Sequence, residues 1–237
     1  MPDLEVLYEQ GACLAVCKPP GLLTQAPPGI DSLEVRVKAF LQDRDGVVEP
    51  YLGVPHRLDR PASGVLVLGK DLRTTRKLGE QFEHRKVRKV YWACVEGRPD
   101  AEIGTWEDYV YKVPGVPKAE VVSAGHPLGR RAVLHYRVLT TGPWGAWLEI
   151  ELETGRTHQI RVQAGSRGHP VLGDAQYGSS TAFGPQYEDV RLQAIALHAR
   201  SLMFRDPTTR EIVTVTAPLA QYWPAPDGEG FRCGANC

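Results

Sequence analysis

The alternation of hydrophobic and polar residues along the chain predicts many strands and few helices. Residues 6–18 hold two apolar runs separated by a turn, which predicts a β-hairpin. Four consecutive apolar residues at 65–68 predict a buried strand, and residues 86–96 alternate as a half-buried strand does. The span 104–153 contains four further strand-like runs separated by Gly and Pro turns. A last hairpin is predicted on either side of Asp206 and Pro207.

Helical spacing is limited to short stretches of the chain. It predicts a helix over 32–43, with Asp31 or Ser32 as the cap and Glu34 completing a capping box after Asp31. A second helix is predicted over 71–84, and a third begins at His158 with Thr157 as its cap.

Few helices among hairpin-connected strands predict a single α+β domain. We expect a largely antiparallel, mixed central sheet flanked by helices and loops. The domain is assigned to residues 1–223, with a long loop at 170–192, and residues 224–237 are expected to form a flexible tail.

The charge of the chain is balanced overall but unevenly distributed. The 28 basic and 28 acidic residues cancel, which argues against a protein that coats nucleic acid by bulk charge. Between His56 and Tyr91, however, ten Lys and Arg stand against four acidic residues. Such segregation is what a local RNA-binding surface requires, although solvated helix faces account for part of it.

Composition also bounds the compartment and the cofactor chemistry. The acidic N-terminus and the lack of a long apolar run predict a cytoplasmic protein that does not enter a membrane. Five cysteines, at 13, 17, 94, 233 and 237, fit reduced thiols, with Cys13 and Cys17 as small core residues. The two C-x3-C pairs are poorly spaced for zinc and the histidines are dispersed, so no metal is expected.

The segment 55–71, PHRLDRPASGVLVLGKD, carries the most legible chemistry. A polar loop precedes a buried strand, and catalytic groups are often positioned in this way. Asp59 lies between Arg57 and Arg60, whose charges favour an ionised carboxylate. Such a group could act as a base, a nucleophile or a ligand, or it could merely cap a turn.

The motif HRLD-x-x-x-SG resembles the signature of the RluA-type pseudouridine synthases, and further stretches match that family in the same order. They are KPPGLL at 18–23, KVYWACVEG at 89–97, LETGRTHQIRV at 152–162, and GHPVLGDAQYG at 168–178 followed by LHA at 197–199. The resemblance extends from about residue 4 to 220. It implies a pseudouridine-synthase fold and an isomerase that acts on uridine in structured RNA, either rRNA or tRNA, without a cofactor.

By this resemblance Asp59 is the catalytic carboxylate, Tyr91 stacks on the base and handles a proton, and Arg161 forms an ion pair with Asp59. Arg57 fills the space that the flipped uridine leaves. The remaining expected substrate contacts are His56, Thr157, His158 and Gln159 around the site, and Lys18 and Lys89 on phosphate.

Two departures from the family pattern are visible. Ala62 stands where relatives commonly have Thr, and the chain begins at the catalytic hairpin, so we expect no separate N-terminal RNA-binding domain. With Pro61, the stretch HRLDRP resembles the motif of a subgroup of the family that includes a tRNA-modifying member.

Other activities remain open at this level. The chain could be an RNA-binding or folding factor without turnover, although Asp59, Tyr91 and Arg161 are all present. A carboxylate-based glycoside hydrolase is a weaker alternative because no second acid is placed to pair with Asp59. We expect a monomer with no obligate protein partner.

Overall fold

The computed structural model describes residues 4–224, which form two compact units. Of the described residues, unit 1 comprises 4–89 and 199–219, and unit 2 comprises 90–198 and 220–224. The prediction that residues 1–223 act as one domain stays a prediction. The tail expected over residues 224–237, which holds Cys233 and Cys237, lies outside the described residues from 225 onward.

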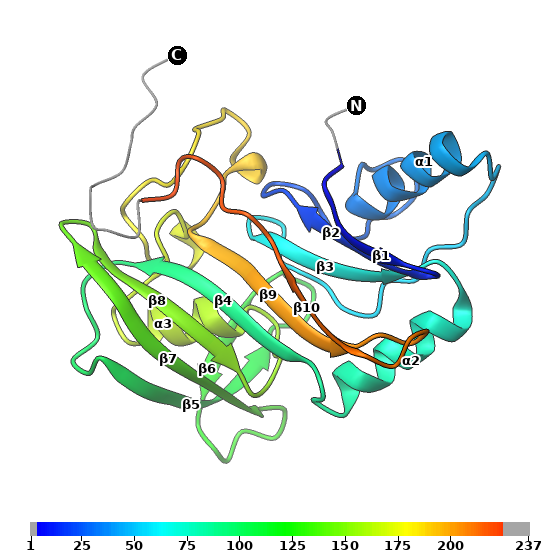
Figure 1. Ribbon diagram of the computed structural model, residues 1–237. Coiled ribbons are helices and arrows are strands. Elements are labelled where there is room, and N and C mark those ends of the chain that lie inside the picture. Colours follow the sequence, from blue (N-terminus) through cyan, green and yellow to red (C-terminus); the bar gives the residue numbers. More distant parts are fainter. Residues whose placement is uncertain (1–3, 225–237) are drawn as a thin grey trace. The chain divides into compact units, whose positions relative to one another are not determined.

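Unit 1 is built on the predicted N-terminal hairpin and the buried strand that follows it (Figure 1). Strands β1 (Val6–Gln10) and β2 (Cys13–Lys18) are antiparallel, and β2 is antiparallel to β3 (Ser63–Gly69). Strand β9 (Leu197–Arg205), which belongs to unit 1 from Ala199 onward, lies next to β3, and β10 (Ile212–Thr216) pairs antiparallel with β9. Every residue of β3 is buried, so the loop that enters it rests on a rigid strand.

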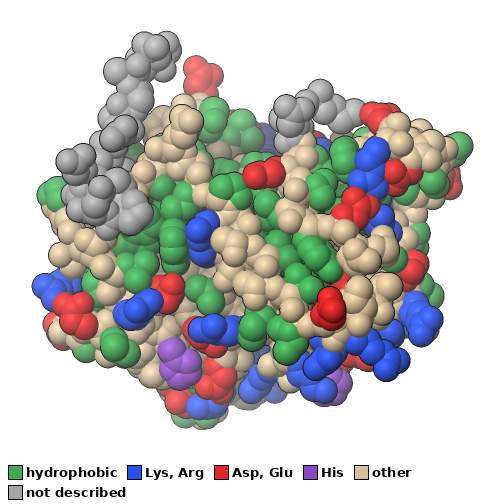
Figure 2. Space-filling model, viewed as in Figure 1, with side chains coloured by type: hydrophobic (Ala, Val, Ile, Leu, Met, Phe, Trp, Pro, Cys, Tyr) green, Lys and Arg blue, Asp and Glu red, His purple; other side chains and the backbone are tan. Residues whose placement is uncertain are grey.

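Two helices complete unit 1. Helix α1 (Leu33–Asp45) buries Leu33, Val37 and Leu41, which are four positions apart and therefore share a face. Helix α2 (Leu72–Glu83) begins at the predicted cap, because the Asp71 side chain accepts a hydrogen bond from the Thr74 N–H. Figure 2 shows Lys and Arg side chains gathered over the region of α2.

Unit 2 carries an antiparallel sheet in the order β4–β8–β7–β5–β6. The strands are β4 (Arg88–Val95, in unit 2 from Val90), β5 (Ile103–Lys112), β6 (Ala119–Val122), β7 (Arg130–Gly142) and β8 (Gly145–Leu152). Helix α3 (Gln159–Ser166) belongs to the same unit (Figure 1). Its Val162 is buried in one hydrophobic cluster with Val110 and Ala132 of the sheet. The predicted α+β fold with a largely antiparallel sheet is confirmed.

Three local predictions need correction. Ser32, whose side chain accepts from the Val35 N–H, caps α1, and Asp31 instead forms an ion pair with Arg36, so the capping box is wrong. Thr157 does not cap α3, which starts one residue later than predicted, after a left-handed His158.

The third correction concerns the loop at 170–192, which contains two 3-10 turns, η1 (Ala175–Tyr177) and η2 (Val190–Leu192).

The predicted core role of Cys13 is confirmed by its complete burial beside Ala15, and Cys17 packs against the same cluster.

Candidate active site

The Asp59 loop of unit 1 is tied down by the segment that follows β2. The Lys18 ammonium, with no exposed surface, donates to the carbonyl oxygens of Pro19 (2.8 Å), Leu22 (2.7 Å) and Arg60 (3.2 Å). In return, the Arg60 Nε donates to the Gly21 carbonyl at 2.8 Å. The KPPGLL motif therefore supports the backbone immediately after Asp59.

Thr24 adds a second tie to the same loop. Its hydroxyl donates to the Leu58 carbonyl at 2.9 Å and accepts from the Leu58 N–H at 3.2 Å, and both residues are buried. Within the loop, the buried Ala62 donates its N–H to the Asp59 carbonyl at 3.1 Å, which closes a turn. The half-buried Asp59 thus projects from a backbone that is fixed on both sides.

The contacts of Lys18 differ from the phosphate contact predicted for it. All three hydrogen-bond donors of an ammonium group are directed at main-chain oxygens, which leaves none for RNA phosphate. Burial lowers the pKa of Lys18 to about 7, and the charge of Asp59 acts in the opposite direction. We interpret Lys18 as a residue that positions the Asp59 loop.

His56 anchors the start of the loop. Its Nε2 accepts a hydrogen bond from the Val67 N–H of β3 at 2.9 Å, and its ring stacks on Phe82 of α2 with centroids 4.2 Å apart. Desolvation, with the charge of Lys89 acting in the same direction, lowers the pKa of His56 to about 3. The imidazole is therefore neutral near pH 7, and its acceptor nitrogen is engaged by the backbone.

The Ser-Gly pair at the start of β3 meets a steric requirement. Gly64 has φ +117, and a Cβ at this position would lie 2.3 Å from the Ala199 carbonyl oxygen of β9. Only glycine fits such a close approach of two backbones. Gly64 is also the register partner of Lys18. The residue that supports the Asp59 loop therefore lies directly opposite the glycine at which β3 and β9 approach closely.

In unit 2, Arg161 lies on α3 and is almost completely buried. Its Nε and Nη2 donate to the two carboxylate oxygens of Asp174 at 2.6 and 2.8 Å, and Nη2 also donates to Gln176. The Tyr177 ring lies 4.9 Å from the guanidinium carbon. Asp174 was missed at the sequence level, although it stands in the matched GDAQYG stretch. The predicted pairing of Arg161 with Asp59 stays a prediction.

The residues that lead into α3 differ in what they contact. Gln159 is buried and joins the loop to β7, since its amide accepts from Thr154 and from the Arg156 N–H and donates to the Val133 carbonyl. His158 contacts the Tyr177 hydroxyl at 2.8 Å through Nδ1, whereas Thr157 is exposed. Gln159 and His158 therefore shape this loop, and Thr157 is the side chain of the three that is open to solvent.

The other predicted residues lie on β4 or on the Asp59 loop. Tyr91, in unit 2, is 9% exposed and in register with Ile150 of β8. Lys89, which precedes it in unit 1, is half-buried, and Arg57 is exposed beside the buried Leu58.

The described residues contain no cluster of His, Cys, Asp and Glu that could hold a metal ion. No helix within residues 4–224 has the length and apolar character needed to span a membrane.

An α+β fold with a tethered carboxylate loop and matched motifs defines the class of RNA-modifying synthases to which the sequence pointed. The model of the RNA pseudouridylate synthase family matches residues 12–166. The chain belongs to this family, and the RluA-type resemblance and the assignment as an isomerase are confirmed.

Similar proteins support the same conclusion. An uncharacterized RNA pseudouridine synthase of Synechocystis sp. is 35% identical over 93% of this chain and 67% of its own length. The ribosomal large subunit pseudouridine synthase D of Zymomonas mobilis is 33% identical over 92% of this chain and 70% of its own. The solved structure of human RNA pseudouridylate synthase domain containing 4 has a TM-score of 0.74 at 23% identity, over 92% of this chain and 89% of that one, which shows the shared fold.

Proposed function

We propose that the protein isomerises one or more specific uridines in structured RNA, either rRNA or tRNA, to pseudouridine, with Asp59 as the catalytic carboxylate. The observation that carries the proposal is the support of the Asp59 loop by Lys18 and Thr24, inside the segment matched by the family model. The backbone is fixed on both sides of one carboxylate, which is expected of a catalytic site because catalysis depends on the precise position of the reacting group. The similarity to the ribosomal large subunit pseudouridine synthase D of Zymomonas mobilis supports the rRNA alternative.

The reaction rearranges bonds within one nucleotide. The N1–C1′ glycosidic bond breaks, the uracil turns, and C5 bonds to C1′, while the C5 proton is lost and N1 gains one. Cleavage develops positive charge on the ribose, so a carboxylate near C1′ is the group that this chemistry needs. Asp59 can serve this step either by attacking the ribose or by removing its 2′ proton.

Two further catalytic roles belong to the proposal. Tyr91 presents an aromatic ring for the base and a hydroxyl for the proton at C5. Arg161 supplies a positive charge that pairs with the Asp59 carboxylate, and its bidentate pairing with Asp174 limits the orientation of the guanidinium.

Two roles concern the RNA itself. Arg57, exposed on the loop, occupies the space vacated by the flipped uridine, and Lys89 contacts phosphate. The enzyme is proposed to act as a cytoplasmic monomer without a cofactor.

The test compares Asp59→Asn with Asp43→Asn, a matched loss of one carboxylate on the exposed surface of α1. Each protein is expressed in a strain that lacks the gene, and pseudouridines are mapped in total tRNA and rRNA. We expect wild type and Asp43→Asn to restore the same sites, and Asp59→Asn to lose about 10³-fold or more in rate on the corresponding transcript. Equal restoration of pseudouridines by Asp59→Asn and wild type would show that Asp59 is not catalytic. If wild type itself restored no pseudouridine, an RNA-binding factor without turnover would be favoured.

A further inference from the structure

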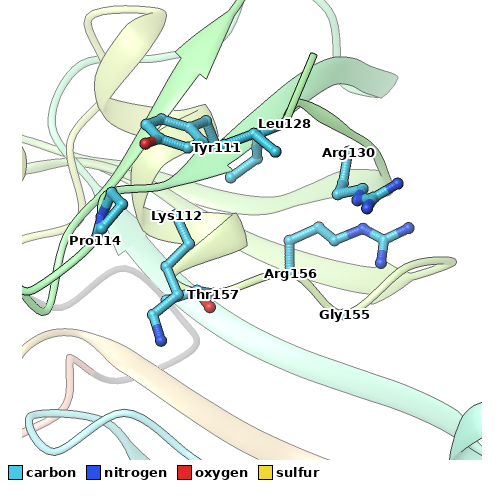
Figure 3. Close-up of a pocket in the computed structure, with 9 residues that line it drawn as sticks. Tyr111, Lys112, Pro114, Leu128, Arg130, Gly155, Arg156 and Thr157 are labelled. Atoms are coloured by element: carbon cyan, nitrogen blue, oxygen red, sulfur yellow. The ribbon is translucent and has the colours of Figure 1, made fainter. Parts of the chain in front are cut away.

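A pocket of about 400 Å³ opens on unit 2 at one end of β5 and β7, beside the loop that follows β8 (Figure 3). Its size is within the range of small-ligand sites. Its lining is Val110, Tyr111, Lys112, Pro114, Leu128, Arg130, Gly155, Arg156 and Thr157. Of these residues, Thr157 alone was predicted to contact the substrate.

The lining carries three cations and no acid. Among the described residues, Lys112 and Arg130 have no carboxylate partner, and both side chains are exposed. Arg156 is held in place because its Nε donates to the Arg131 carbonyl at 2.9 Å. In Figure 3 the side chains of Arg130 and Arg156 extend in the same direction. Such a pair of guanidinium groups is suited to an anion with several oxygens, such as phosphate.

The neighbouring acids are already engaged, which leaves the pocket positively charged. Arg131 follows Arg130 on β7, so its side chain points to the opposite face of the strand. There it forms ion pairs with Glu107 and Glu153.

The other wall of the pocket is aromatic and apolar. The half-buried Tyr111 ring packs against His126 with centroids 4.7 Å apart, which restricts its rotation. Leu128 lies beside it in Figure 3 and is 56% exposed. A fixed aromatic ring next to cations is the combination that binds a nucleotide of single-stranded RNA, with the base on the ring and the backbone on the charges.

We propose that this pocket binds a nucleotide of the RNA substrate that flanks the target uridine. Tyr111 and Leu128 contact its base, and Lys112, Arg130 and Arg156 contact the adjoining phosphates. The inference rests on the proposed function. The pocket and the proposed catalytic residue Arg161 belong to one short segment of the chain, since Thr157 in the lining precedes Arg161 of α3 by four positions.

The test measures the binding of fluorescein-labelled decauridylate to the full chain by fluorescence anisotropy at several salt concentrations. Lys112→Ala with Arg130→Ala removes two pocket cations. The matched control is Arg98→Ala with Arg137→Ala, which removes two exposed cations of the same unit. Arg137 is the register partner of Ile103 at the far end of β5, whereas Arg130 is that of Val110 beside the pocket.

We expect the pocket variant to bind about tenfold more weakly. The slope of log K against log salt concentration should be shallower by about 1.4, because each phosphate contact to a single strand contributes about 0.7 to this slope. Tyr111→Ala should bind about tenfold more weakly without a change in this slope, and Tyr111→Phe should bind as wild type does. The control variant should stay within twofold of wild type.

The proposal is overturned if wild type does not bind decauridylate, or if the pocket and control variants lose affinity equally. It is also overturned if labelled decaglutamate binds wild type as tightly as the RNA does, since the pocket would then accept an acidic peptide. Binding is measured in the Asp59→Asn background as well. Pocket-dependent binding without any pseudouridine formation by wild type would refute the proposed function and leave the RNA site standing.

Discussion

Replacing Lys18 with methionine removes a buried charge while nearly preserving the volume of the side chain. The ammonium has no exposed surface, and burial lowers its pKa from 10.5 to about 7. Between these two pH values the unfolded chain binds more protons than the folded one, so the stability of wild type rises with pH. The methionine variant lacks this contribution, and the other ionisable groups are common to both proteins.

The magnitude follows from the size of the shift. At 1.36 kcal/mol per pKa unit, the unfolding free energy of wild type should rise by about 2 kcal/mol relative to Lys18→Met between pH 7 and pH 9. Below about pH 6 the difference between the two proteins should be constant. Its value there combines the relief of a buried charge with the loss of donors to the Pro19, Leu22 and Arg60 carbonyls.

The assay is urea unfolding, followed by circular dichroism at pH 6, 7, 8 and 9. Lys86→Met, at an exposed position of the same unit, serves as the matched control and should track wild type at every pH. A difference between wild type and Lys18→Met that does not change between pH 7 and pH 9 would refute the inference that Lys18 is buried as a destabilised ammonium. Because the Arg60 tether is lost, kcat should also fall more than the affinity for RNA does.

Three further predictions concern the supports of the site. Gly64→Ala should cost at least about 2 kcal/mol in thermal unfolding because the added Cβ meets the backbone of β9, whereas Gly79→Ala, in open space on α2, should be neutral or stabilising by up to about 1 kcal/mol. Arg161→Ala and Asp174→Ala should each cost about 3–5 kcal/mol in urea unfolding, and the double variant should cost clearly less than the sum; additive costs would show that the two groups are not coupled. The pKa of His56 is lowered to about 3, so wild type should lose stability relative to His56→Phe as the pH falls from about 6.5 to 4, and parallel pH profiles would contradict a neutral imidazole that accepts from the Val67 N–H.

Where the prediction from sequence succeeded, the signal was local. Leu33, Val37 and Leu41 share one helix face, and the apolar run of β3 is buried throughout, as periodicity predicts. The capping box failed because Asp31 had a closer partner in Arg36, and a pattern of residue types does not encode that choice. The Thr157 cap failed because Gln159 folds back to bond the Arg156 N–H, which fixes the entry into α3 in another way.

The sequence by itself determined the family, the α+β class and the loop that carries Asp59, because short motifs in a fixed order and the period of apolar residues are local properties of a chain. It could not determine that the Lys18 ammonium is buried and bonded to main-chain oxygens, or that Asp174 pairs with Arg161. Nor could it show that Tyr111, Arg130 and Arg156 line one pocket. These facts depend on burial and on contacts between residues far apart in the chain, and only the packed tertiary structure decides where a charge loses its water and which partner replaces it.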